Sequence, residues 1–220
     1  MKDIYIQTQN LIIREISIAD VFSLERIRQA INANKNNRPY YALKDPGDAQ
    51  KFCKEALQQQ DVKPRETVGL AITEKKKPHQ MIGFVIGELT DLDKKDWDGQ
   101  VGLGDIGYFM DPHFQGKGFV TEAIRGFMSK LFFEELGYSY LSATVHPQNT
   151  PSINVLQSVG FIPYGSTLKY GGEPRLLLRV DKDDFYAHKN HKGENKNIIV
   201  SQNTKIVKGF LQEKSAHERG

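Results

Sequence analysis

The sequence predicts a single mixed α/β domain, and two observations carry this prediction. Short β-rich segments alternate with amphipathic helical segments over residues 10–180. The chain has 220 residues, of which 39% are hydrophobic and 26% charged, and these values are typical of one globular domain with its own core. We therefore place the domain at residues 1–180 and a polar C-terminal extension, which loses the pattern, at residues 181–220.

Composition excludes several classes of protein. The net charge is +3 with both signs interspersed, so nothing points to nucleic acid or an anionic membrane as a partner. Cys53 is the only cysteine, which excludes a disulfide framework and a cysteine-rich zinc site, and its place on an apolar helix face predicts a core position. The polar N-terminus and the absence of a long apolar run predict a cytoplasmic protein without a signal peptide or membrane span.

A strand and two helices are predicted first. Leu11–Arg14 is a short apolar run, and Ser17 and Asp20 have the spacing of a capping box at a helix start. Apolar residues then recur at helical spacing over 21–31 and again over 46–60. These segments give a strand followed by two amphipathic helices.

A hairpin and a further strand follow. The β-rich runs 67–73 and 81–89 are separated by a turn-like, lysine-rich segment, so we expect them to pair. A polar surface loop is expected over 91–99. Residues 104–110 then predict a strand that Asp111-Pro112 ends.

The strongest helix signal lies after residue 118. Apolar residues recur at i, i+3 and i+4 from Val120 to Phe132, and Gly137 is expected to end the helix. Residues 140–145 predict the next strand. The two strands that flank this helix should be parallel, because a helix is the usual crossover between parallel strands.

The last elements are a helix and a hairpin. Thr150 is expected as the N-cap of the helix, with Pro151 at its first position and Gly160 at its end. The runs 162–170 and 174–180 then flank Gly171-Gly172, a pair typical of a two-residue hairpin turn.

A glycine-rich segment lies between the predicted strand and the strongest helix. In Gln115-Gly116-Lys117-Gly118, the free N–H groups of the first helical turn and the helix dipole favour an anion, and the glycines allow close backbone approach. The spacing matches neither a Walker A loop nor a dinucleotide fingerprint. A tight turn without a ligand is the competing interpretation of the same residues.

At this point the chain resembles the GNAT superfamily of acetyl-CoA-dependent N-acetyltransferases. The family signature Q/R-x-x-G-x-G/A at a helix start is matched by 115–120, except that Val120 replaces the usual Gly or Ala. The segment 145–161 is similar to the family's fifth strand and following helix. Together with Asp105-Ile106-Gly107-Tyr108, these motifs resemble the RimJ/RimL-type branch of ribosomal-protein N-terminal acetyltransferases. The resemblance implies the GNAT fold over 10–180, with a central twisted mixed sheet of about six to seven strands.

The resemblance also implies how acetyl-CoA is bound. Its pyrophosphate would lie on the backbone amides of the glycine-rich segment and helix start, namely Gln115, Gly116, Lys117, Gly118, Phe119, Val120 and Thr121. Its pantetheine arm would pair like an added strand with Phe109, Met110 and Asp111, and Asn149 would form a hydrogen bond with this arm. An amide of that strand edge would polarise the thioester carbonyl.

Proton transfer decides which amine is the easier substrate. At pH 7 an α-amino group is roughly 10 to 17% neutral, whereas a lysine side chain is only about 0.04% neutral. Asp105 is the candidate base that removes the proton from the attacking amine. The alternative role of Asp105 is a structural hydrogen bond to a neighbouring loop. Many family members protonate the thiolate with a tyrosine at the position that is Leu156 here. Ser152 is the residue that the RimJ/RimL-type branch offers instead, and a first-turn helix residue without a catalytic role is its alternative.

The resulting hypothesis is an acetyl-CoA-dependent N-acetyltransferase that acts on a primary amine, with a protein N-terminal α-amine as first choice. A small-molecule amine, such as a polyamine, an amino acid or an antibiotic, is the alternative substrate. A non-catalytic acyl-CoA sensor and a structural domain are the alternatives from other classes. No metal is expected, and the oligomeric state, a homodimer included, is left open.

Overall fold

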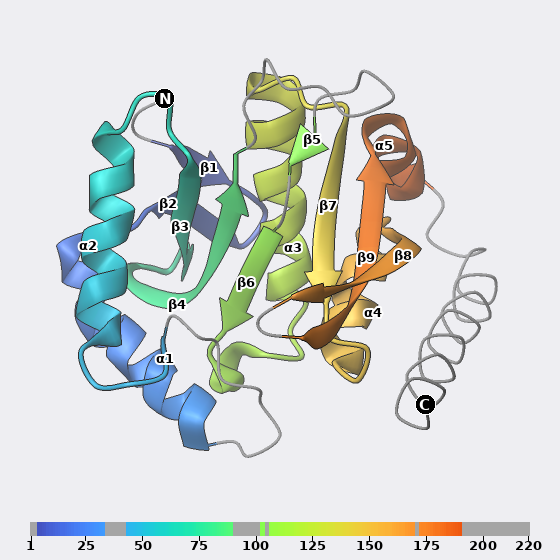
Figure 1. Cartoon of the computed structure of the whole chain (residues 1–220). Coiled ribbons are helices and arrows are strands. Elements are labelled where there is room, and N and C mark those ends of the chain that lie inside the picture. Colours follow the sequence, from blue (N-terminus) through green and yellow to red (C-terminus); the bar gives the residue numbers. More distant parts are fainter. Residues whose placement is uncertain (1–3, 34–42, 90–101, 104–105, 170–171, 191–220) are drawn as a thin grey trace, which may run out of the picture.

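The computed structural model describes residues 4–33, 43–89, 102–103, 106–169 and 172–190, and in these the strands form two sheets (Figure 1). The first is antiparallel, with the order β1-β2-β3-β4-β6, and the second has the order β5-β7-β9-β8. The mixed α/β class is confirmed, but the expected central sheet is divided between β6 and β7. The strands are β1 (Tyr5–Gln7), β2 (Leu11–Glu15), β3 (Thr67–Glu74), β4 (Lys77–Glu88), β5 (Gly102–Leu103), β6 (Ile106–Met110), β7 (Tyr140–Val145), β8 (Ile162–Lys169) and β9 (Glu173–Asp181).

Helices cover both faces of the first sheet. Helices α1 and α2 pack on one face, where the buried Cys53 confirms its predicted core position. Helix α3 packs on the other face. None of the described helices is long and apolar enough to cross a membrane. The helices are η1 (Ile18–Asp20), α1 (Val21–Ala33), α2 (Asp48–Asp61), η3 (Pro112–Phe114), α3 (Phe119–Phe127), its continuation η4 (Met128–Glu135), α4 (Thr150–Ser158) and α5 (Lys182–Asn190).

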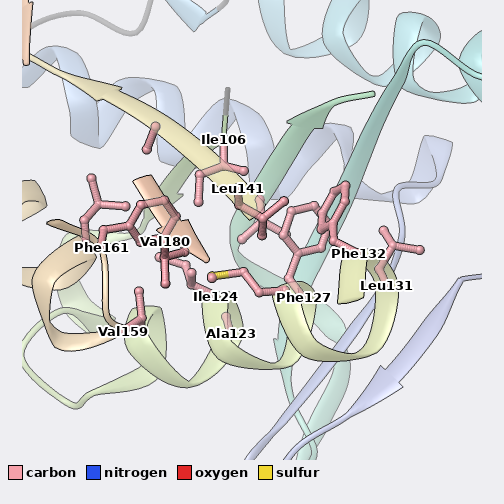
Figure 2. Packing of buried hydrophobic residues seen from close by; sticks show 14 of the residues in the cluster. Ile106, Ala123, Ile124, Phe127, Leu131, Phe132, Leu141, Val159, Phe161 and Val180 are labelled. Atoms are coloured by element: carbon pink, nitrogen blue, oxygen red, sulfur yellow. The ribbon is translucent and has the colours of Figure 1, made fainter. Parts of the chain in front are cut away.

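Helix α3 joins the two sheets through one apolar face. Ala123, Ile124 and Phe127 are buried against residues of both sheets, among them Ile106 of β6 and Leu141 of β7 (Figure 2). Burial of a large aliphatic or aromatic side chain contributes roughly 1.5–3 kcal/mol. The shared core therefore fixes where α3 begins relative to the ends of β6 and β7.

The predicted long helix changes its winding after Phe127. Residues Met128–Glu135 form a π-helix, and the N–H of Leu136 donates to the carbonyl of Leu131, five residues earlier, at 2.9 Å. The wider turn allows the consecutive residues Leu131, Phe132 and Phe133 all to be buried, which a regular α-helical face does not permit. The predicted end is confirmed, because Gly137 follows with a φ of 70°.

Several boundaries differ from the sequence prediction, and β4, for example, begins at Lys77 instead of residue 81. Asn149, not Thr150, is the N-cap of α4, and its side chain accepts a hydrogen bond from the N–H of Ser152. Both residue types cap well and proline is tolerated at either of the first positions, so sequence alone did not separate them. The ladder between β8 and β9 ends at the pair Lys169 and Glu173, so three residues connect these strands instead of two.

Helix α5 lies in the segment that the sequence assigns to the polar extension. Its Phe185 is buried and its ring centroid lies 5.2 Å from that of Phe133. Residues 182–190 therefore pack on the core of the domain, whereas residues 191–220 lie outside the described part of the chain.

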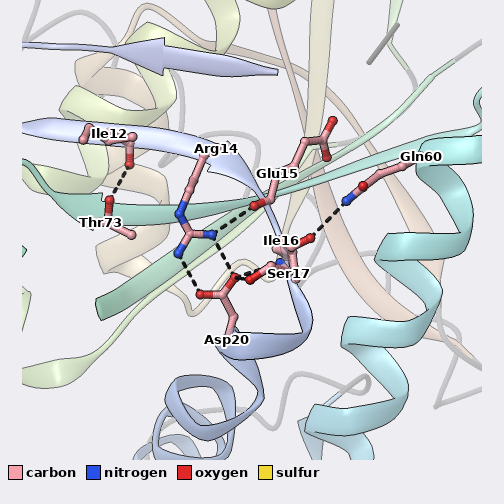
Figure 3. A network of polar contacts seen from close by, with 8 residues as sticks. All are labelled: Ile12, Arg14, Glu15, Ile16, Ser17, Asp20, Gln60 and Thr73. Carbon is pink, nitrogen blue, oxygen red and sulfur yellow. Dashed lines mark hydrogen bonds and ion pairs between the residues drawn. The ribbon is translucent and has the colours of Figure 1, made fainter. Parts of the chain in front are cut away.

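A network of polar contacts holds the corner between β2 and α1 (Figure 3). Arg14 of β2 donates two hydrogen bonds of 2.8 Å to the carboxylate of Asp20, which also accepts from the N–H of Ser17, as the predicted capping box requires. Gln60 of α2 donates to the carbonyl of Ile16 at 3.0 Å. Burial acts to raise the pKa of Asp20, but the bonds from Arg14 and Ser17 outweigh it and hold the pKa below its usual value.

Strands β4 and β6 approach each other closely at Gly83. A Cβ at this position would overlap the carbonyl oxygen of Phe109 on β6. Only glycine allows this contact, so Gly83 sets the distance between the two strands.

Replacing Gly83 with alanine should lower the free energy of unfolding by about 1–3 kcal/mol, because the backbone of β6 must shift. Gly69→Ala is the matched control, since its Cβ would meet only side-chain atoms at 3.5 and 3.7 Å. Urea denaturation measures both variants. Equal stabilities of the two would contradict the close approach.

The Asp20→Asn variant should lose about 2–4 kcal/mol of stability at pH 7, because a buried ion pair loses one partner. The lowered pKa of Asp20 stabilises the fold above its unfolded pKa of about 3.9, and this contribution is lost as the pH falls through the folded value. The difference from wild type should therefore shrink below about pH 4. Glu134→Gln, at an exposed ion pair with Lys130, is the control and should change stability by less than about 1 kcal/mol.

Candidate functional site

The candidate site lies where the two sheets separate. Strands β6 and β7 run side by side in the same direction, as predicted, yet belong to different sheets (Figure 1). Their C-terminal ends lie at the same end of the molecule as the starts of α3, α4 and β9. Backbone groups, helix termini and side chains from several elements therefore meet there.

The edge of β6 that faces away from β4 presents backbone hydrogen-bonding groups. The N–H of Asp111 donates to the carbonyl of Ile82 on β4 at 2.8 Å, so by alternation Phe109 also points toward β4. Tyr108 and Met110 then point their backbone groups toward the separation. Phe109, Met110 and Asp111 were expected to pair with the pantetheine arm, but of these only Met110 presents its backbone amide at the open edge of β6. Tyr108, which was not among the expected residues, also presents its amide at this edge.

The carboxylate of Asp111 is used inside the protein. It is buried, and it accepts hydrogen bonds from the N–H of His113 at 3.0 Å and from Nε of Arg26 on α1 at 3.1 Å. Burial acts to raise the pKa of Asp111, but the bonds from His113 and the charge of Arg26 lower it below its usual value. Asp111 therefore fixes the end of β6 to the following turn and to α1.

The glycine-rich segment exposes a row of backbone amides. Gly116 and Gly118 have positive φ angles of 73° and 77°, and a Cβ at either position would have no atom of a non-adjacent residue within 4 Å in the part of the chain that the structure describes. Gly118 caps α3 without a side-chain bond, and the N–H groups from Gly116 to Thr121 have no partner among the described residues. With the positive end of the helix dipole, these amides form a site suited to a diphosphate.

The neighbouring side chains support this segment. The carboxamide of Gln115 donates to the carbonyl of Met110 at 2.9 Å, and its N–H is directed to the carbonyl of Pro112, so Gln115 braces the loop and offers no free amide. Lys117 is exposed, with Nζ 4.9 Å from the centre of the Phe114 ring, and adds a positive charge.

The first turn of α3 carries three further residues of interest. Phe119 and Val120 are half-buried and pack on the core, so the branched side chain of Val120 points away from the exposed loop. Thr121 Oγ1 lies 3.2 Å from Ser158 Oγ of α4. The carboxylate of Glu122 accepts hydrogen bonds from Thr8 Oγ1 and from the N–H of Asn10, in the turn before β2. Glu122 therefore binds this turn and does not face the glycine-rich segment.

Helix α4 brings Ser152 next to β6. Ser152 Oγ lies 2.7 Å from the hydroxyl oxygen of Tyr108, and this phenol also donates to the carbonyl of Ser152 at 3.1 Å. Burial raises the pKa of Tyr108 above its usual value, although the bond with Ser152 acts to lower it. The backbone N–H of Asn149 donates to the carbonyl of His146 at 2.9 Å, but its side-chain nitrogen Nδ2 has no partner among the described residues, so Nδ2 is available to a ligand.

The other predicted residues are placed differently. Asp105, the candidate base, lies outside the described residues, so its role stays a prediction. Leu156 is buried in the core, so this face of α4 presents no acid. Burial raises the pKa of Cys53 to about 11, which makes it an inert thiol. No cluster of metal-ligating side chains occurs in the described parts of the chain.

Sequence reasoning missed His146 and Glu173. His146 is buried at the end of β7, where Nδ1 accepts from the N–H of Gln148 at 3.1 Å, and Nε2 lies 3.8 Å from the carboxylate of Glu173 on β9. The neutral ring therefore carries its proton on Nε2, the nitrogen on the side of Glu173. A polar residue directly after the predicted strand 140–145 was the available signal for His146.

Comparisons with known proteins agree with this architecture. Residues 10–162 match the acetyltransferase (GNAT) domain family. An uncharacterized N-acetyltransferase, p20 of Bacillus licheniformis, is 36% identical over 83 residues, which cover 38% of this chain and 46% of that protein. The chain thus spans less than half the length of this curated relative.

Two solved structures have a similar fold. RimJ of Mycobacterium smegmatis, in complex with CoA-disulfide, gives a TM-score of 0.66 at 17% identity, covering 86% of this chain and 95% of that chain. The ribosomal-protein-S5-alanine acetyltransferase of Vibrio fischeri gives 0.64 at 20% identity, covering 83% and 99%. At these identities the likeness concerns the fold, and it confirms the fold predicted from the sequence motifs.

Proposed function

The chain belongs to the GNAT acetyltransferase domain family, and from this premise we propose that it transfers the acetyl group of acetyl-CoA to a primary amine. A protein N-terminal α-amine is the substrate class that we propose first. The observation that carries the proposal is the row of amides from Gly116 to Thr121, which have no partner among the described residues and lie at the end where β6 and β7 separate.

The residues at the start of α3 fit the diphosphate of CoA. No atom of a non-adjacent described residue lies within 4 Å of a Cβ built at Gly116 or Gly118, which leaves room for phosphate oxygens against the backbone. The amides that would bind them run from Gly116 to Thr121, and Lys117 adds charge. Gln115 supports the loop through its bond to the Met110 carbonyl and is not itself a donor in this proposal.

The open edge of β6 fits the pantetheine arm. Outward amides at Tyr108 and Met110 would pair with its amide groups as a neighbouring strand does, and the free carboxamide nitrogen of Asn149 would add a donor. One of these backbone amides would also stabilise the negative charge that develops on the thioester oxygen.

The proposed reaction is direct. The amine nitrogen forms a bond to the acetyl carbon as the carbon–sulfur bond breaks, one proton leaves the amine, and one proton joins the sulfur to give the free thiol of CoA. Asp105 is the proposed base and Ser152 the proposed donor to sulfur. A thiol with a pKa near 8.5 is a tolerable leaving group, so a hydroxyl donor suffices.

The substrate class rests on two arguments. An α-amine is roughly 10 to 17% neutral at pH 7, so it needs far less help from a base than lysine does. Solved proteins of similar fold carry names that include a ribosomal-protein alanine acetyltransferase. A small-molecule amine is the second candidate, and the assay below separates the two.

The amine class is tested by incubating the protein with acetyl-CoA and a panel of peptides, polyamines, amino acids and aminoglycosides while free thiol is measured. We expect release with peptides that have a free N-terminus and none with the same peptides blocked at the N-terminus. Acetylation of small amines alone would replace the protein substrate by the second candidate. Tight acetyl-CoA binding without thiol release would favour a sensor.

The diphosphate assignment is tested by Gly118→Leu. A side chain there would occupy the space of the phosphates, so the affinity for CoA should fall at least tenfold by calorimetry. Gly137→Leu is the matched control, since its φ of 70° and its open surroundings impose the same backbone strain of about 1–2 kcal/mol at the other end of the helix. Equal loss of affinity in both variants would contradict the assignment.

A further inference from the structure

A tyrosine on β6 makes the closest side-chain contact with Ser152. The phenol oxygen of Tyr108 lies 2.7 Å from Ser152 Oγ and 3.1 Å from the Ser152 carbonyl oxygen, although the two residues are 44 positions apart. Asn149 fixes the same residue from the other side by accepting its backbone N–H at 3.2 Å. Three atoms of Ser152 are therefore held in place.

Helix α4 itself carries no tyrosine. The position at which many family members carry the acid is Leu156, which is buried in the core and cannot reach the separation between the strands. Tyr108 brings a phenol to the first turn of α4 from a different element, the open edge of β6. The hydroxyl pair therefore lies beside the amides proposed to bind pantetheine.

We propose that Tyr108 is a positioning residue for acyl transfer, whose phenol holds the Ser152 hydroxyl so that its O–H is directed to the sulfur of bound CoA. The inference rests on the proposed function. The phenol has a single proton, which it can donate either to the Ser152 carbonyl oxygen at 3.1 Å or to Ser152 Oγ at 2.7 Å. When it donates to Oγ, the serine proton is not shared with Tyr108 and is available to the departing thiolate. The Ser152 hydroxyl then gives its proton to the sulfur. The serine is reprotonated by solvent or by the proton that leaves the amine.

Tyr108 itself keeps its proton. Burial raises its pKa above the usual value, so the phenol is a stable hydrogen-bond donor at neutral pH and a poor source of a transferred proton. This is why the role is positioning and not acid catalysis. A phenol that merely ties α4 to β6 would stabilise the fold without affecting the sulfur, and the experiment must separate these roles.

The first measurement is the pKa of the CoA thiol in the complex. It is obtained from a pH titration in which the ultraviolet absorbance of the thiolate is monitored. A hydroxyl directed at the sulfur stabilises the thiolate. The pKa of the CoA thiol in the wild-type complex should therefore be about one pH unit lower than the pKa of the thiol in free CoA. Tyr108→Phe and Ser152→Ala should each restore the free value while CoA affinity changes less than about twofold. Tyr164→Phe, an exposed tyrosine on β8, is the control and should behave as wild type.

The second measurement is a double-mutant cycle on kcat with acetyl-CoA and the best amine. Tyr108→Phe should lower kcat about tenfold with an unchanged KM for acetyl-CoA, and the double variant should be no slower than Ser152→Ala alone. Additive losses, or an unchanged thiol pKa in a Tyr108→Phe protein that binds CoA normally, would overturn the inference alone. A wild-type protein that fails to bind CoA in calorimetry would overturn the proposed function and the inference with it.

Discussion

The apolar face of α3 is the constraint on which the rest of the structure depends. It is buried against β6 of one sheet and β7 of the other, so it is the element that joins two sheets whose facing strands are not paired (Figure 2). Without this shared core, the separation between β6 and β7 would have no fixed width. Because the same helix begins at the end where the strands separate, its free amides and the open strand edge are held in a constant relation.

In the proposed site, binding would depend on backbone geometry more than on charge. A net charge of +3 gives little general attraction for an anion, and the charged side chain Asp111 near the strand end is committed to Arg26 and His113. Arg26 lies on α1, which the Arg14–Asp20 network fixes to β2 (Figure 3). A contact far from the loop thus helps to hold the end of β6, and in the proposal the local amides would supply the attraction for phosphate.

Local signals predicted most elements, and long-range pairing limited the rest. The strand 140–145 and the glycine loop before α3 follow from periodicity and glycine placement, which depend on neighbouring residues only. The division of the sheet could not be predicted, because strand order depends on contacts between distant segments. The orientation of the β6 amides and the contact of Tyr108 with Ser152 have the same origin, since alternation and helix placement decide them only after the strands have paired.

The most direct test of the account is an NMR titration of isotope-labelled protein with CoA, compared with pantetheine, which lacks the diphosphate. The amides of residues 116–121 should show the largest chemical-shift changes with CoA and almost none with pantetheine, while those of Tyr108 and Met110 should respond to both. Binding of CoA that leaves the amides of residues 116–121 unchanged would contradict the account.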